Sequence, residues 1–383
     1  MAEWLLMPPG APRLLVVAVA AGIVAAIWMR RRWCAALDEC AAPPAQGGGG
    51  GSTRCLVIVA RDEEERLPGL LWDLERLLDE DKALEILLAD DASRDGTRRL
   101  LESFCAGRTR ARLLPACPQL RGKPAWLRAA VAEGCGAQVL LSDADCRLPR
   151  GWSLALGGLL DEGLAAAGGP VLLERQAAPA AAARWQRLHW ILLSGAAAAL
   201  SARAAARGRG EAPSLWGGNL AFDRARLEAL GGYAALAAAT SNEDLTLARA
   251  LARRGAPTAF RPAPPSLRVR TAAVSWSDCA RQQARWATGL ARLSRRQALP
   301  VLLALLWLAA LAGVLLARPL LGLLLGAAGA LTLASLLSEL AARLGEDPVP
   351  PGEAALYLAA WPALALGALW HALRGDLRWR RSA

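Results

Sequence analysis

The sequence predicts an α/β domain with a mostly parallel sheet, flanked by membrane-spanning helices near both ends of the chain. Short apolar runs alternate with helical patterns between residues 55 and 142, and this alternation is typical of parallel strands covered by helices. Long apolar stretches lie at 14–29, which has no charged residue, and at 299–337, which is broken only by Arg318. Hydrophobic residues fill 54% of the 383 positions, which is high for a wholly soluble protein.

The N-terminal segment has the pattern of a membrane anchor. Residues 14–29 are apolar and are followed by Arg30, Arg31 and Arg32. A signal peptide carries its positive charge before the apolar core, so we expect an uncleaved anchor over residues 1–34 with its N-terminus outside. Residues 35–54 contain two prolines and a run of glycines, a composition that buries no apolar surface. We therefore predict a flexible linker there.

The alternating pattern opens the predicted central domain, which covers residues 55–298. Strands are expected at 55–60, 84–89, 112–114 and 139–142, with helices at 67–78, 97–104 and 124–133. In open α/β sheets, ligands bind beyond the carboxyl ends of the strands. Carboxylates follow three of these ends, at Asp62, Asp90, Asp91, Asp143 and Asp145. We therefore expect a ligand site at this edge of the sheet.

The later segments allow more than one interpretation. Residues 185–206 combine tryptophans and leucines with flanking arginines, which fits a helix at a membrane surface or an ordinary packing helix. The region 299–373 is expected to hold two or three membrane helices, followed by a basic tail at 374–383. Three helices would put the arginines of 378–381 outside, against the positive-inside bias. Either one C-terminal segment lies in the interface or re-enters the membrane, or the tail is an exception to this bias, and both counts stay open.

The charge and cysteine content limit the classes of partner. The formal net charge is +11, but the arginines cluster beside apolar segments, where anionic lipid headgroups explain them better than nucleic acid does. We expect a membrane partner and no nucleic acid. The eight cysteines are scattered without a C-x-x-C pair, which argues against structural zinc and against a disulfide framework.

Two acidic elements at strand ends suit the binding of a nucleotide and a cation. The carboxylates of Asp90 and Asp91 can accept hydrogen bonds from a uracil N–H or from ribose hydroxyls, although an Asx turn before the next helix would use the same residues. Asp143 and Asp145 form a D-x-D element, and their hard oxygen atoms suit a divalent cation. An isolated D-x-D is common by chance, so the metal-binding interpretation rests on its position directly after a predicted strand.

Three further elements lie towards the membrane segments. Gly217-Gly218-Asn219 permits a close approach of backbone to a ligand, and a simple turn is the alternative. Glu243-Asp244 fits a general base with a supporting acid, or only the first turn of a helix. The box from Gln282 to Trp286 contains Arg285, which suits a diphosphate, while an interfacial helix would also favour Arg and Trp.

Taken in order, these elements resemble the membrane-bound family 2 glycosyltransferases over roughly residues 55–293. The resemblance implies a GT-A fold that handles nucleotide-diphospho-sugars. It implies that Asp143 and Asp145 hold Mn²⁺ or Mg²⁺ and that Asp244 is the catalytic base, supported by Glu243. Donor contacts are expected at Ala60, Asp62, Asp90, Asp91, Lys123 and Asp143, and diphosphate or acceptor contacts at Gly217, Gly218, Asn219, Gln282, Arg285 and Trp286.

The resemblance also implies a reaction. We expect an inverting hexosyltransferase that moves a sugar from a nucleotide-sugar donor, with a UDP-sugar favoured, to a lipid hydroxyl or carboxyl group. Synthesis of a polysaccharide from a glycan acceptor is the second interpretation, and a catalytically silent membrane scaffold is the third. The expected location is a bacterial inner membrane, with the catalytic domain in the cytoplasm.

Overall fold

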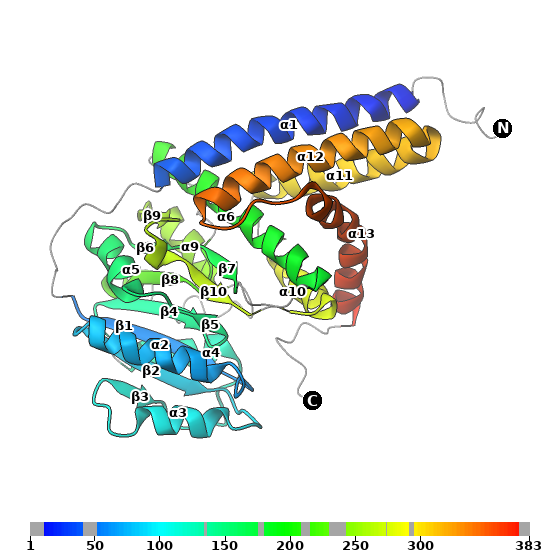
Figure 1. Ribbon diagram of the computed structural model, residues 1–383. Helices are drawn as coiled ribbons and strands as arrows, with labels where there is room; N and C mark the ends of the chain where they lie inside the picture. The colour runs from blue at the N-terminus through cyan, green and yellow to red at the C-terminus, as the bar shows by residue number, and fades with distance from the viewer. Residues whose placement is uncertain are drawn as a thin grey trace. The chain divides into compact units, whose positions relative to one another are not determined.

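The computed structural model describes residues 11–40, 52–133, 136–174, 180–207, 215–229, 243–272, 274–290 and 295–374. The chain divides into two compact units. Residues 35–178 and 190–273 form an α/β unit, and residues 1–34, 179–189 and 274–383 form a helical unit. Figure 1 shows the strands and the helices of both units.

The α/β unit is built around a largely parallel sheet. In the described residues its strand order is β3-β2-β1-β4-β8-β6-β9, and β1, β2, β3 and β4 are joined by parallel pairing. The strands are β1 Arg54–Ala60, β2 Leu84–Asp90, β3 Ala111–Leu113, β4 Gln138–Asp143, β6 Ala166–Gly168, β8 Leu220–Asp223 and β9 Thr258–Phe260. β8 runs antiparallel to both of its neighbours. The predicted α/β class with a mostly parallel sheet is confirmed.

Apolar residues alternate between the two faces of the central strands, so each face carries its own core. Leu56 and Ile58 of β1 belong to the cluster formed with α2, α3 and α5, whereas Cys55 and Val57 belong to the cluster formed with α4 and α9. Burial on both faces explains why these strands read as continuous apolar runs. The helices of the unit are α2 Leu67–Glu80, α3 Thr97–Cys105, α4 Lys123–Ala132, α5 Trp152–Asp161, α7 Arg224–Glu228 and α9 Glu243–Arg253.

A second, smaller sheet adjoins the end of β4. Its described strands have the order β5-β10-β7, with β5 at Cys146–Arg147, β10 at Val269–Thr271 and β7 at Val171–Leu173. The 3-10 turn η2 covers Pro265–Leu267. Only two residues separate the end of β4 from the start of β5. The D-x-D turn is therefore held on one side by the large sheet and on the other by this small sheet.

The helical unit contains the long apolar segments. Its elements are α1 Ala11–Cys40, α10 Trp276–Leu290, α11 Arg295–Ala317, α12 Pro319–Arg343 and α13 Pro351–Leu373, together with the start of α6 Ala181–Arg207. In the described part of the chain, three segments are long and apolar enough to cross a membrane: Leu14–Glu39, Pro319–Arg343 and Pro351–Leu373. Leu306–Ala317 of α11 is a shorter apolar stretch.

The N-terminal helix is longer than the sequence predicts. We expected an anchor that ends at residue 34 and a linker that begins at residue 35, but α1 continues to Cys40. The arginines after the apolar core do not end the helix, because Arg favours helical backbone nearly as much as Leu does. The glycine run at 47–51 lies outside the described residues.

Candidate active site

Parallel strand pairing brings three acidic loops to one edge of the sheet. In the register of β1, Ala60 lies beside Asp90 of β2, and Val59 lies beside Asp143 of β4. These residues end their strands, so their side chains stand where such sheets bind ligands. Asp145 follows Asp143 in the two-residue turn before β5.

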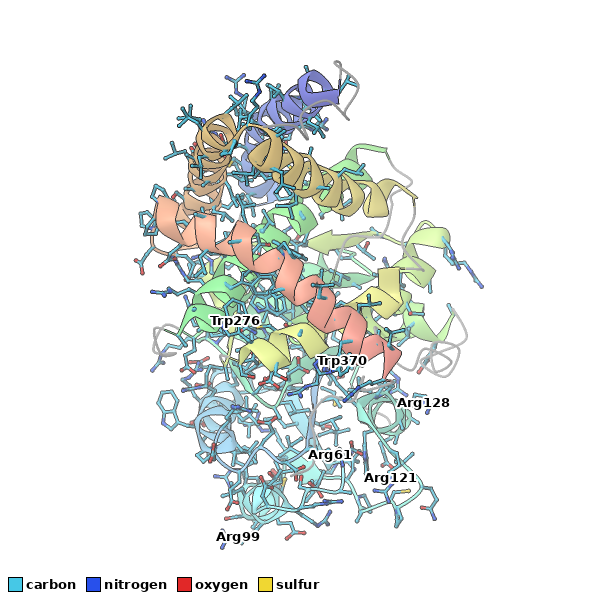
Figure 2. The ribbon with its side chains drawn as sticks, turned by 90° about the vertical axis from the view of Figure 1, so that its right-hand side faces the viewer. Arg61, Arg99, Arg121, Arg128, Trp276 and Trp370 are labelled. Carbon is cyan, nitrogen blue, oxygen red and sulfur yellow. The ribbon has the colours of Figure 1, made fainter. Side chains whose placement is uncertain are left out.

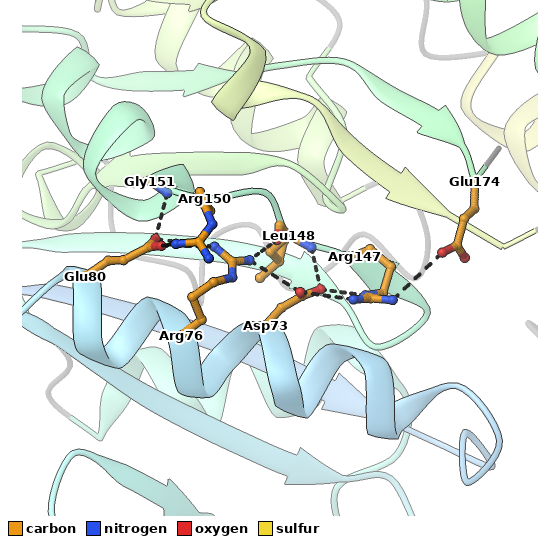
Figure 3. Close-up of polar contacts among 8 residues, drawn as sticks. All are labelled: Asp73, Arg76, Glu80, Arg147, Leu148, Arg150, Gly151 and Glu174. Atoms are coloured by element: carbon orange, nitrogen blue, oxygen red, sulfur yellow. Dashed lines mark hydrogen bonds and ion pairs between the residues drawn. The ribbon is translucent and has the colours of Figure 1, made fainter. Parts of the chain in front are cut away.

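Asp73 of α2 anchors the strand that follows the D-x-D turn. Its carboxylate is almost fully buried and accepts hydrogen bonds from Nε of Arg147 at 2.6 Å and from the backbone N–H of Leu148 at 3.1 Å. Glu80, two turns further along α2, accepts a hydrogen bond from the N–H of Gly151 at 2.8 Å. Figure 3 shows this network from α2 to the segment after the turn. The sequence pattern gave no signal for Asp73 beyond an acidic residue within a helix.

The D-x-D turn has an unusual charge environment. Burial, together with the neighbouring carboxylates of Asp143 and Glu63, raises the pKa of Asp145 to about 7. Lys123, at the start of α4, forms an ion pair with Oδ1 of Asp143. A ligand atom from each of Asp143, Asp145 and Cys146 lies within 4.8 Å of the others, which is compact enough to surround one ion. The two carboxylates fit a hard cation, whereas burial keeps the thiol of Cys146 protonated by raising its pKa.

The glycine turn connects the D-x-D element to Asp244. Ser142 donates a hydrogen bond from Oγ to the carbonyl of Gly218 at 3.0 Å, and a Cβ added at Gly218 would lie 2.9 Å from Oδ2 of Asp143. The preceding residue, Gly217, donates its backbone N–H to Oδ2 of Asp244 at 2.9 Å. The structure therefore brings three separate sequence elements into direct contact within the α/β unit.

Asn219, the third residue of the glycine turn, is fully buried and has a structural role. Its Oδ1 accepts a hydrogen bond from the indole N–H of Trp152 at 3.0 Å, and its amide group donates to the carbonyls of Pro170 and Leu267. These partners use the hydrogen-bonding capacity of the side chain. Asn219 therefore fixes the turn, and the contacts expected from Gly217, Gly218 and Asn219 to the diphosphate or acceptor stay predictions.

The loops after β1 and β2 are bound to each other. Asp62 accepts a hydrogen bond from the N–H of Arg94 at 2.7 Å and donates its own N–H to Oγ of Ser93 at 3.1 Å. Asp90 accepts from the N–H of Ser93 at 3.3 Å, as the Asx-turn interpretation expects. Asp62 has a positive φ of 52°, a conformation that a non-glycine residue rarely adopts.

Asp91 connects the β2 loop to the loop that carries Lys123. Its Oδ1 accepts hydrogen bonds from the N–H of Gly122 at 2.9 Å and from the indole N–H of Trp126 at 3.1 Å. Gly122 has a φ of +79°, which only glycine adopts readily. Asp91 thus holds the start of α4, from which Lys123 reaches Asp143. The roles of Asp62, Asp90 and Asp91 in nucleotide binding stay predictions.

The box from Gln282 to Trp286 lies on α10 in the helical unit. The side-chain nitrogen of Gln283 lies 3.2 Å from Nε2 of His189, and the ring of Trp286 stacks on His189 with centroids 5.8 Å apart. Nδ1 of His189 lies 3.0 Å from the hydroxyl of Tyr357. Burial lowers the pKa of His189 to about 3, so its ring is neutral at physiological pH. The sequence assigned no role to His189, which holds the box against α6 and α13.

Some predicted residues cannot be compared with the structure at the level of side chains. Glu243 is the first residue of α9, but its side chain lies outside the described part of the structure. Asp143, Asp145, Gly217 and Asp244 all belong to the α/β unit, whereas Gln282, Arg285 and Trp286 belong to the helical unit.

Part of the α/β unit is similar to known proteins. Residues 55–223 match the model of the family described as Glycosyl transferase family 2. No curated protein matches the chain. The chain is similar to the mannosyltransferase PcManGT from Pyrobaculum calidifontis, solved with GDP-Man and Mn²⁺, at 19% identity and a TM-score of 0.49, covering 96% of each chain. It is also similar to glucosyl-3-phosphoglycerate synthase from M. tuberculosis at 20% identity and a TM-score of 0.37, covering 62% of this chain and 76% of that one.

Proposed function

We infer from its glycosyl transferase family 2 domain, which residues 55–223 form, that this protein is a glycosyltransferase. We propose further that it is an inverting hexosyltransferase bound to a membrane. In this proposal it moves a sugar from a nucleotide-sugar donor, with a UDP-sugar favoured, to a hydroxyl or carboxyl group of an amphiphilic lipid.

One observation supports the catalytic assignment above all others. Asp143, Gly218, Gly217 and Asp244 form a continuous series of contacts, although the first and the last are 101 positions apart. A D-x-D element and a candidate base are common in isolation. Their meeting at the carboxyl edge of the sheet gives the leaving group and the acceptor hydroxyl one common location.

The donor end of the site uses oxygen ligands and positive charge. Asp143 and Asp145 would hold Mn²⁺ or Mg²⁺, which when bound supplies positive charge for the departing diphosphate. Lys123 is paired with Asp143, and we propose that it turns to the diphosphate when the donor binds. Ala60, Asp62, Asp90 and Asp91 would surround the base and ribose.

The acceptor end is assigned to Asp244 and to the box on α10. Asp244 would take the proton of the acceptor, with Glu243 as a supporting acid, and a single displacement would invert the anomeric carbon. Gly217 and Gly218 would permit close approach of the sugar. Gln282 and Trp286 would line the acceptor, and Arg285 would add positive charge near the diphosphate.

A lipid acceptor is favoured over a polymer because apolar segments occupy so much of the described helical unit. A polymer channel normally needs more membrane helices than residues 1–34 and 299–373 supply, so polysaccharide synthesis is our second candidate. A silent scaffold is disfavoured because Asp143, Asp145 and Asp244 are all retained. We propose a bacterial inner membrane as the location, with the α/β unit in the cytoplasm, because Arg30 to Arg32 precede this unit.

The experiment measures nucleotide release by the detergent-purified protein. A panel of UDP-, GDP- and dTDP-sugars is offered with Mn²⁺ or Mg²⁺ and with extracted membrane lipids. We expect release from one donor that requires metal, increases with lipid and disappears in Asp244→Asn. Asp79→Asn is the matched control. The side chain of Asp79 is highly exposed, and in the described residues its ion pair is with Lys82 at 3.9 Å. Lack of release and of donor binding under every condition would contradict the enzyme assignment.

A further inference from the structure

The helix α13 has the length and composition of a membrane span, but its neighbours do not suit the interior of a bilayer. It covers Pro351–Leu373 and is rich in Ala and Leu. Counted as a span, it would leave the C-terminal arginines on the side opposite the α/β unit. The contacts within the helical unit resolve this conflict.

The helices α1 and α11 pack together in opposite directions. Leu15, early in α1, lies against Gly313, late in α11, whereas Val19 accepts a hydrogen bond from the indole N–H of Trp307, further back in α11. Val19, Ala310 and Val314 form the apolar centre of this pair. The helices α1 and α11 are therefore antiparallel.

The helix α12 returns in the direction of α1. Its Gly329 lies against Trp307 of α11, and Arg30 of α1 contacts Ser335 at 2.5 Å and Glu339 at 3.4 Å. The carboxyl ends of α1 and α12 therefore lie side by side, as the parallel course of the two helices in Figure 1 also shows. We call α1, α11 and α12 the spanning bundle, and its charged pair at Arg30 suits the end of a span rather than its middle.

The helix α13 packs on the polar helix α10 as well as on α12. Ala280 of α10 would lie 3.1 Å from a Cβ added at Gly367 of α13, and α10 carries the ion pair between Asp278 and Arg281. At the start of α13, Arg187 of α6 pairs with Glu353 at 3.6 Å and with Glu346 at 3.6 Å, which places this end in a polar setting. If α13 crossed the bilayer, the charged pair of α10 beside Gly367 would have to enter the hydrocarbon with it, which is costly.

The opposite face of α13 is apolar and exposed. Leu366 is 69% exposed, Leu369 is 56% exposed and Leu373 is 77% exposed. Near its carboxyl end the guanidinium of Arg374 lies 3.8 Å from the ring centroid of Trp370. Figure 2 shows α13 with Trp370 near its end. Tryptophan and arginine at the edge of an apolar face are typical of the boundary between headgroups and acyl chains.

We propose that α13 is an interfacial helix that lies along the surface of the bilayer, with its Leu366 face in the acyl boundary. The chain would then cross the membrane with α1, α11 and α12, and α13 would lie on the side where α1 and α12 end. Arg30 to Arg32, Arg343 and Arg374 share that side, which agrees with the positive-inside bias. The occupant of the exposed face is therefore a lipid surface, continuous with the lipid around the bundle.

The first test locates the C-terminus of the full-length protein in sealed inverted and right-side-out vesicles. One epitope follows residue 383, and a reference epitope is inserted between residues 48 and 49, ahead of the α/β unit. We expect both epitopes to be digested by protease in the same vesicle orientation. Digestion in opposite orientations would overturn the proposal. This readout does not depend on sugar transfer, so it stands apart from the test of the proposed function.

The second test measures depth. A genetically encoded azido amino acid replaces Leu366 or, as the matched control at the middle of α12, Leu331, which is 57% exposed. Each is coupled to an environment-sensitive fluorophore in lipid vesicles that carry a quencher at a shallow or a deep acyl position. We expect stronger shallow quenching at 366 and stronger deep quenching at 331. Deep quenching at both positions would indicate a span, and no quenching at 366 would indicate that another protein surface covers α13; either result would overturn the proposal.

Discussion

The backbone N–H of Gly217 donates a hydrogen bond to Oδ2 of Asp244 at 2.9 Å, which fixes the candidate base to the glycine turn. This contact gives Asp244 a positioning role in addition to its proposed role as the proton acceptor. An asparagine side chain retains an oxygen that accepts the Gly217 N–H but does not act as a base, whereas alanine lacks both properties.

We therefore expect Asp244→Asn and Asp244→Ala to lose transfer equally, by on the order of 10²- to 10⁴-fold in kcat. Asp244→Ala should in addition be less stable by about 1 to 3 kcal/mol, because it leaves the buried Gly217 N–H without its partner. The measurement compares kcat and thermal unfolding for both variants. An active Asp244→Asn beside an inactive Asp244→Ala would show that the role is positioning.

Gly218 is expected to control the position of a D-x-D carboxylate. A Cβ at this residue would lie 2.9 Å from Oδ2 of Asp143, which is closer than real Cβ atoms approach, so Asp143 must move in Gly218→Ala. Displacing a ligand in this way typically weakens metal binding by on the order of 10- to 100-fold. A titration of activity with Mn²⁺ should show this weakening. Gly158→Ala is the matched control, because a Cβ there meets nothing within 4 Å, and its metal dependence should be unchanged.

Much of the α/β unit was predictable from local patterns. The apolar runs of β1, β2 and β4 are buried on both faces, so they give a strong continuous signal, and an aspartate ends β2 and β4 as expected. The D-x-D turn was found in the same way, because Asp143 follows an unmistakable strand. Chain order alone indicated that Asp244 belongs to the same site.

The supporting contacts were not predictable, because they join residues far apart in sequence. Asp73 reads as an ordinary helix carboxylate, yet it is buried and holds Arg147 after the D-x-D turn. Asn219 reads as part of a ligand turn, yet tertiary hydrogen bonds occupy its amide. The apolar composition of α13 suggests a span, whereas its packing on the polar helix α10 gives a contrary indication that composition does not contain.

Glu63 should make the stability of the protein depend on pH. Burial raises the pKa of this carboxyl from 4.5 to about 7, with smaller contributions from Asp143 and Asp95 and an opposing one from Arg66. Between these two values the unfolded chain ionises while the folded protein keeps the proton, so stability falls as pH rises from 4.5 to 7. The total loss is about 3 kcal/mol, since one pKa unit corresponds to about 1.4 kcal/mol.

The variant Glu63→Gln removes this ionisation. We expect its unfolding temperature in detergent to fall less than that of the wild type between pH 5 and pH 8. Removal of the charge also relieves repulsion on Asp145, which acts in the same direction. Identical pH profiles for the two proteins would show that Glu63 is ionised in the folded state already at pH 5.

Lys123 is expected to have opposite effects on the metal and on the donor. Its ammonium group is paired with Asp143, so without nucleotide it competes with a cation for that carboxylate. Lys123→Met should therefore bind Mn²⁺ more tightly in the absence of donor. With donor present, the variant lacks a positive charge for the diphosphate, so the donor KM should rise. A charged hydrogen bond contributes about 1.5 kcal/mol or more, which corresponds to about tenfold in each measurement.

The chain contains a matched control for this prediction. Lys82 is the only other lysine in the sequence, and its side chain is 75% exposed and pairs with Asp79 at 3.9 Å. Lys82→Met removes the same charge from the same molecule, so any effect of net charge alone would appear in both variants. Calorimetric titration with Mn²⁺ and the donor KM together distinguish the outcomes. A group that exchanges Asp143 for the diphosphate must strengthen Mn²⁺ binding when it is removed and must weaken donor binding. If Lys123→Met matched Lys82→Met in both measurements, Lys123 would therefore be an ordinary solvated lysine.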